Sequence, residues 1–116
     1  MIDPLKALDL PAAVAAQARS LAALSRKEVA WPRGAVLEIL PHLRSKSVAV
    51  LGGDVVQFSE DRIHQTSDNW HTEPVHGEAF ADYAQRSIEN TERYIMRYSE
   101  PGLGCCYVLL LADRLA

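Results

Sequence analysis

The chain has 116 residues, of which 48% are apolar and 23% charged, and its formal net charge is −3. This composition is typical of one folded domain that can bury a core, and it argues against a disordered chain. A weakly acidic chain without a clustered basic surface is not typical of a nucleic-acid-binding protein, and no apolar run approaches the roughly 20 residues of a membrane helix. We therefore expect a single cytoplasmic domain that binds neither nucleic acid nor membrane.

The first part of the chain, residues 1–46, is predicted to be mainly helical. Asp3 and Pro4 predict one short capped turn, because proline suits the first position of a helix. Residues 12–24 are rich in alanine, which favours helix but buries little area, so they predict a peripheral helix.

A proline-bounded helix follows. Residues 28–31 are expected to be extended, since Pro32 disfavours the helical region in the residue before it. Pro32 itself then opens a second helix with apolar residues on one face. Pro41 lies within this helix, where a missing N–H donor predicts a kink or a loose last turn.

Residues 47–66 predict a β-hairpin. An apolar strand passes through Gly52 and Gly53, a pair that indicates a bulge or a bend with positive φ. Residues 62–66 alternate in polarity and return as the second arm. Residues 67–69 are Ser-Asp-Asn, whose side chains bond the local backbone, so the strand pairing is expected to end there.

The long helix predicted for residues 77–98 is the clearest element, and a final apolar strand is predicted for residues 105–112. The stripe of this helix consists of Phe80, Tyr83, Ala84, Ser87, Ile88, Thr91, Tyr94, Ile95 and Tyr98. Helices and hairpin strands that are segregated along the chain favour an α+β fold. We expect N-terminal helices, an antiparallel sheet of three or four strands, and the long helix packed on the sheet before the last strand.

A metal site could be drawn from three histidines and two carboxylates in the hairpin and the loop that follows it. These residues are His64, His71, His76, Asp68 and Glu73, and none of them has the tight spacing of a known ligand motif. Solvated polar side chains explain them better, so no metal and no cofactor are predicted.

The two cysteines, Cys105 and Cys106, are neighbours in the predicted last strand. Neighbours in a strand point to opposite faces, which places these thiols poorly for bridging each other. No nucleophile motif surrounds them, so no catalytic residue is predicted, and two free thiols suit a reducing compartment.

Carboxylates gather in or near the hairpin and the start of the long helix, among them Asp54, Asp68 and Glu78. They could form an acidic rim that attracts a basic protein, or a pair could perform acid–base chemistry. Trp70 follows a turn, where it could be an exposed interface anchor or could equally cover the core beside the long helix.

One ordered set of motifs resembles immunity protein family 40 of bacterial polymorphic toxin systems. In chain order these are an apolar strand running into Gly52-Gly53-Asp54-Val55, then Asn69-Trp70, Glu78, Tyr83, Ser87, Tyr94-Ile95 and a final apolar strand. The resemblance covers roughly the C-terminal two-thirds of the chain. Val56 departs from it, because an aromatic residue is expected after the Gly-Gly-Asp-Val motif.

The resemblance implies a non-enzymatic inhibitor that binds and neutralises a cognate toxin domain. The residues expected to bind this partner are Asp54, Asp68, Asn69, Trp70 and Glu78. Those expected to form a structural motif are Gly52, Gly53, Tyr83 and Ser87. Homo-oligomerisation is compatible with the sequence but is not predicted by it.

Two alternatives stay open. A small hydrolase or ligand-binding domain could use Asp54, His64 and Glu78, and would need a deep pocket that gathers these side chains. A pure assembly subunit would instead expose a large apolar patch.

Overall fold

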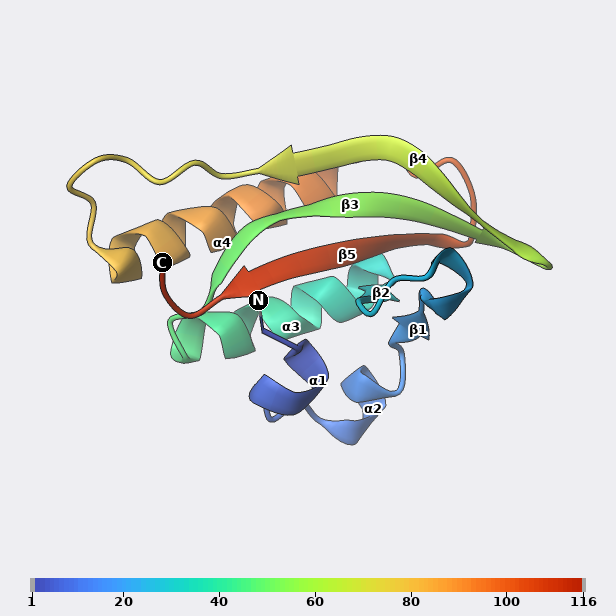
Figure 1. The fold of residues 1–116 in the computed structure, drawn as a ribbon, viewed down its shortest axis with the longest axis horizontal. Coiled ribbons are helices and arrows are strands. Elements are labelled where there is room, and N and C mark those ends of the chain that lie inside the picture. Colours follow the sequence, from blue (N-terminus) through green and yellow to red (C-terminus); the bar gives the residue numbers. More distant parts are fainter. Residues whose placement is uncertain (1, 116) are drawn as a thin grey trace.

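The computed structural model describes residues 2–115, and it shows a mixed α+β domain in which all strands belong to one antiparallel sheet (Figure 1). The strand order is β1-β2-β5-β3-β4. The elements are α1 Pro4–Ala7, α2 Ala12–Ala15, β1 Arg19–Ser20, the 3-10 turn η1 Ala22–Leu24, β2 Val29–Trp31, α3 Arg33–Ser45, β3 Ala49–Ser59, β4 Arg62–His71, α4 Phe80–Arg97 and β5 Cys105–Ala112. The predicted fold class is confirmed.

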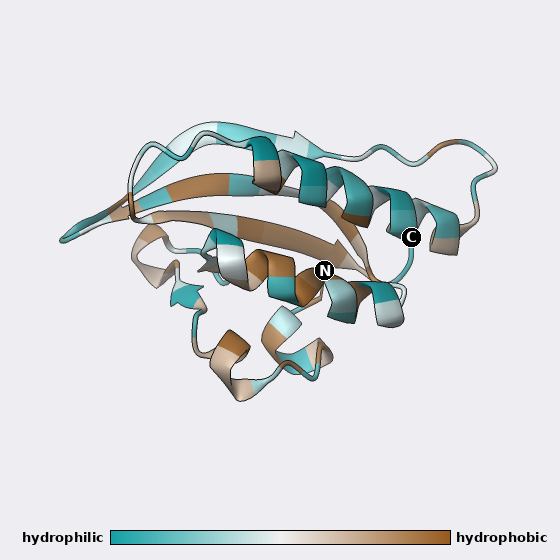
Figure 2. Cartoon of the chain, turned by 180° about the vertical axis from the view of Figure 1, so that it is seen from behind, coloured by the Kyte–Doolittle hydropathy of each residue, from teal (hydrophilic) through white to brown (hydrophobic). Residues whose placement is uncertain are grey.

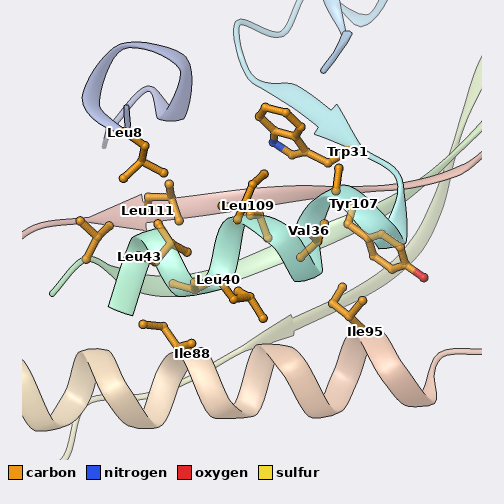
Figure 3. Close-up of a cluster of buried hydrophobic side chains, with 14 of the residues drawn as sticks. Leu8, Trp31, Val36, Leu40, Leu43, Ile88, Ile95, Tyr107, Leu109 and Leu111 are labelled. Carbon is orange, nitrogen blue, oxygen red and sulfur yellow. The ribbon is translucent and has the colours of Figure 1, made fainter. Parts of the chain in front are cut away.

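Helices α3 and α4 lie side by side on one face of the sheet, with α3 against β5 and α4 against β3. Figure 2 shows the polar outer side of α4 facing solvent, with the apolar strands behind it. The main core fills the space between the helices and the sheet, and its members include Val36, Leu40, Ile88, Ile95 and Tyr107, all at most 1% exposed (Figure 3). Burying these side chains supplies most of the driving force for folding.

Helix α3 passes through Pro41 and ends only at Ser45, so the last turn that we expected to be loose remains helical. Pro41 is exposed, and the apolar residues on both sides of it, Leu40 and Leu43, are at most 1% exposed. Burial of these two leucines offsets the hydrogen bond that the proline cannot donate.

The opposite face of the sheet, called here the outer face, carries a second and smaller apolar cluster. Its buried residues are Leu21, Ala30, Val56, Phe58, Cys106 and Val108. The prediction of one helix over residues 12–24 is wrong, because this segment changes from α2 to β1 and then to η1. Leu21 is 0% exposed in the outer cluster. Burial of this residue outweighs the helix preference of the surrounding alanines, and β1 and β2 bring the sheet to five strands.

Strand β4 continues beyond the point where we expected it to end. The register shifts between Asp54 and Val56 of β3, and Ser67 of β4 takes a φ of 71°. The Thr66 hydroxyl donates to the carbonyl of Val55 (2.8 Å), which gives this carbonyl a partner at the irregularity. Residues 66–68 therefore form a β-bulge inside the strand, and pairing resumes at Asn69 and continues as far as His71.

A second bulge lies where β3 pairs with β5, because the register shifts between Val50 and Gly52. The Val50 N–H donates to the Ser87 hydroxyl of α4 (2.9 Å), which satisfies a buried donor at this bulge. Of the two alternatives predicted for the glycine pair, the structure shows a bulge, which lies at Leu51 directly before Gly52, and neither glycine takes a positive φ. Within residues 2–115, no helix is both long and apolar enough to cross a membrane.

Candidate functional site

Three of the five residues expected to bind a partner line one hollow on the outer face, at the bulge of β4. This hollow, called here the polar hollow, has a volume of about 360 Å³. It is lined by Arg26, Asp54, Val55, Val56, Gln65, Ser67, Asp68 and Asn69. Asn69 lies directly opposite Asp54 in the strand register, which explains why these two residues meet.

Arg26 is the central side chain of the polar hollow. Its Nη2 lies 3.0 Å from Asp54 Oδ2 and 3.2 Å from Glu28 Oε1, and its Nη1 lies 3.4 Å from Gln65 Oε1. The pKa of Glu28 is lowered, first by its own backbone N–H and then by Arg26. One guanidinium is thus held between two carboxylates in a fixed geometry, and this cluster keeps one negative charge in excess.

No pattern in the sequence pointed to Arg26, because this residue precedes Asp54 by 28 residues. It belongs to the turn that follows η1, where Ser25 takes a φ of 58° and the chain reverses toward β2. Only the pairing of β1 with β2 and of β2 with β5 carries this turn onto the outer face.

Asp68 links the polar hollow to the end of α4. Its carboxylate accepts a hydrogen bond from the Tyr98 hydroxyl (2.6 Å). This bond, together with burial, raises the pKa of Tyr98 to about 12. Asp68 and Asn69 are both exposed, so both are accessible to a protein that approaches the outer face.

Trp70 lies in the core and not on the surface. It is 7% exposed, its ring stacks on Tyr94 with centroids 4.7 Å apart, and its Nε1 donates to Thr91 Oγ1 (3.0 Å). Of the two interpretations of this residue, the structure supports the one that places it beside the long helix. Trp70 can support a contact surface but has little area with which to form one.

Glu78 lies outside the polar hollow. It precedes α4, accepts two hydrogen bonds from Arg86 (2.9 and 2.8 Å) and a third from the Val75 N–H. The bond with Arg86 is the main reason why the pKa of Glu78 is lowered. Glu78 therefore fastens the loop before α4, on the helix side of the sheet, while Asp54 faces away from the helices.

The four residues expected to form a structural motif all make internal contacts. A Cβ on Gly52 would lie 2.3 Å from the Trp70 carbonyl oxygen, and one on Gly53 would lie 2.1 Å from the Val108 carbonyl oxygen. The Tyr83 hydroxyl donates to the Thr72 carbonyl (2.7 Å), and the Ser87 hydroxyl oxygen accepts from the Val50 N–H at the second bulge. The glycines permit close approach of β3 to its two neighbours, and the hydroxyls bind the helix to the strands.

The alternative of an acid–base site is not supported by this arrangement. His64 is exposed and is opposite Gln57 in the ladder, Glu78 is bound by Arg86, and the hollow at Asp54 includes neither of them. In the part of the chain that the structure describes, no three His, Cys, Asp or Glu residues are placed to hold a metal ion. Cys105 and Cys106 are buried, and burial raises the pKa of Cys105 to about 11.

The exposed large apolar side chains come from separate segments and give little support to a pure assembly subunit. These residues are Leu5, Val75, Met96, Leu103 and Leu115. Scattered exposed apolar residues are usual on protein surfaces, whereas an assembly face needs a contiguous patch.

Comparison with known proteins identifies the family of the chain. Neither the curated proteins nor the solved structures gave a match. The family model of immunity protein 40 matches residues 20–112, which contain β2 to β5, both long helices and every lining residue of the polar hollow. Since this match spans most of the 116 residues, the chain belongs to the immunity protein 40 family.

Proposed function

We propose that this protein neutralises a cognate toxin domain by direct protein–protein contact, and that the polar hollow on the outer face is part of the contact surface. Family membership supports a protein toxin as the partner. We choose this surface because of the Arg26 cluster with Asp54 and Glu28. Hydrogen bonds hold this cluster in place, and it is open to solvent on the face of the sheet that the long helices do not cover.

The physical properties of this surface suit a basic partner. Asp68 and Asn69 are exposed at the rim, and the Arg26 cluster beside them carries an excess of negative charge. Negative charge on a rim increases the rate at which a basic partner associates, and side chains already held by hydrogen bonds lose little freedom when a complex forms.

A non-enzymatic role also agrees with what the polar hollow contains. Its one cationic side chain is occupied by two carboxylates and an amide, and no cysteine, histidine or serine–base pair lies in its lining. The hollow offers recognition groups and lacks the paired nucleophile and base of an acyl-transfer site.

The test is co-expression with the cognate toxin domain, to be sought as the C-terminal domain of a large secreted protein encoded beside this one. The wild-type protein should restore growth and co-purify with the toxin domain. Asp68→Lys should weaken this complex at least tenfold, because it reverses a rim charge. Glu92→Lys is the matched control, since it makes the same charge change on the exposed side of α4.

Failure of the folded wild-type protein to bind an active toxin domain would contradict the proposed function. Equal binding by Asp68→Lys and Glu92→Lys would retain the toxin as partner but move the contact away from the polar hollow.

A further inference from the structure

The outer edge of β5 is covered in two separate pieces. Strand β2 pairs with it at Tyr107 and Val108, and the backbone of Ile2 pairs with it at Leu111. Figure 1 shows the N-terminal segment and β2 reaching the same edge of β5 at different points along its length. Between these two pieces, no strand within residues 2–115 pairs with this edge of β5.

A second hollow lies at this point and is larger than the polar hollow. This edge hollow has a volume of about 630 Å³ and is lined by Ile2, Asp3, Pro4, Ser25, Arg26, Lys27, Glu28, Val29 and Leu109. The side chains of Ile2, Pro4, Val29 and Leu109 make its lining apolar, and charged side chains form its rim. An apolar hollow with a charged rim is the usual receptor for an anchoring side chain at a protein interface.

The two hollows are neighbours, because Arg26 lines both of them. Together they present four carboxylates, on Asp3, Glu28, Asp54 and Asp68, against two cationic side chains, on Arg26 and Lys27. The surface thus combines an apolar receptor with an excess of negative charge. The matching partner segment carries a large apolar side chain next to basic residues.

The walls of the edge hollow differ in origin. Residues 25–29 belong to the part of the chain that matches the family model, which begins at residue 20. Ile2, Asp3 and Pro4 lie outside it. The segment that carries them is nonetheless packed on the fold, since Pro4 is buried and Leu8 is 2% exposed in the main core.

We propose that the edge hollow receives a large apolar side chain, flanked by basic residues, from the cognate toxin domain, and that the N-terminal segment sets partner specificity by forming one wall. This inference rests on the proposed function and extends it. The family scaffold supplies the floor and one wall, and a segment outside the family match completes the receptor.

The experiment measures binding of the same toxin domain by titration calorimetry to variants of the full chain. Val29→Arg and Ile2→Arg place a charged side chain in the edge hollow and should each weaken binding at least tenfold. Leu5→Arg is the matched control within the N-terminal segment, because Leu5 is 42% exposed and does not line the hollow. Thermal unfolding of each variant identifies any that has lost its fold.

Lys27→Glu provides a second test of the edge hollow. This test does not depend on core packing, since Lys27 is exposed on the rim. It makes the rim more negative, so it should raise the association rate several-fold at low salt, and this gain should fall at high salt.

The outcomes separate the two proposals. If the wild-type protein binds and Asp68→Lys weakens binding, but Val29→Arg and Lys27→Glu leave it unchanged, the edge hollow is overturned while the toxin contact stands. Equal losses for Ile2→Arg and Leu5→Arg would overturn the role of the N-terminal wall. Absence of wild-type binding would overturn both.

Discussion

Replacement of Gly53 by alanine should be one of the most damaging single-methyl changes in this protein. Gly53 lies in β3 between β4 and β5, opposite Trp70 on one side and Leu109 on the other. An added Cβ would lie 2.1 Å from the Val108 carbonyl oxygen and 2.4 Å from the Trp70 ring. The first contact is with backbone in a paired strand, so no side-chain rotation relieves it.

The size of the effect follows from the cost of overpacking. An extra methyl group in a packed core costs about 1–3 kcal/mol, and a contact with fixed backbone places this case at about 3 kcal/mol. For a domain of this size, that loss lowers Tm by about 12 °C. The same change should alter the fluorescence of Trp70, whose ring must move away from Gly53 and so shift against Tyr94.

Gly34→Ala is the matched control. A Cβ on Gly34 meets nothing within 4 Å, and Gly34 lies in the first turn of α3. Alanine there should raise stability by about 0.5 kcal/mol, since it reduces the freedom of the unfolded chain. If urea unfolding gives Gly53→Ala the same stability as the wild-type protein, close approach of the strands is not the reason for glycine at this position.

Three further predictions concern the polar contacts. Thr91→Val leaves the Trp70 indole N–H without its acceptor and should cost about 1–3 kcal/mol in urea unfolding, whereas no loss would show that this bond is dispensable. The pKa of Glu78 in the folded protein is lowered below its ordinary value of 4.5. The ionised carboxylate therefore stabilises the fold above pH 4.5, and this stabilisation is lost as the pH falls through the folded pKa. Glu78→Gln should flatten this acid dependence of Tm, and a Tm profile equal to that of the wild-type protein would contradict the reasoning. Asp68→Asn should lower the pKa of Tyr98 from about 12 toward 10, so phenolate absorbance should appear at a lower pH in an alkaline titration. A titration curve equal to that of the wild-type protein would refute the contribution of the carboxylate.

The sequence predicted those elements whose burial pattern is strong and local. Helix α4 runs from Phe80 to Arg97 within the expected 77–98, because its stripe repeats over five turns. The last strand was likewise expected at residues 105–112 and is found there. Residues 12–24 could not be predicted from local pattern, since the decisive contact of Leu21 is with an outer cluster formed by β3 and β5.

In the candidate site, Asp54 and Asn69 are predicted by the family resemblance and not by strand register, because the sequence predicts that strand pairing ends at residues 67–69. Asn69 and Asp54 are opposite each other in the hairpin, so both reach the polar hollow. Arg26 could not be found, because the turn that carries it reaches this face through β2 and β5. The sequence groups Glu78 with Asp54 by charge, by position near the hairpin and by the family resemblance, but the structure places Glu78 beside Arg86 and Asp54 in the polar hollow on the outer face.

Most residues that carry the family resemblance have their side chains inside the domain. Gly53 makes room for the Trp70 ring, Trp70 stacks on Tyr94, and Ser87 satisfies a bulge of β3. Side chains used in this way cannot also touch a toxin over a large area. The family motifs therefore identify the scaffold, and the choice of partner must depend on side chains that the scaffold leaves exposed. We expect those side chains to include Asp68 in the polar hollow and Asp3 in the N-terminal wall of the edge hollow, so variants there should discriminate between partners better than variants of the motif residues.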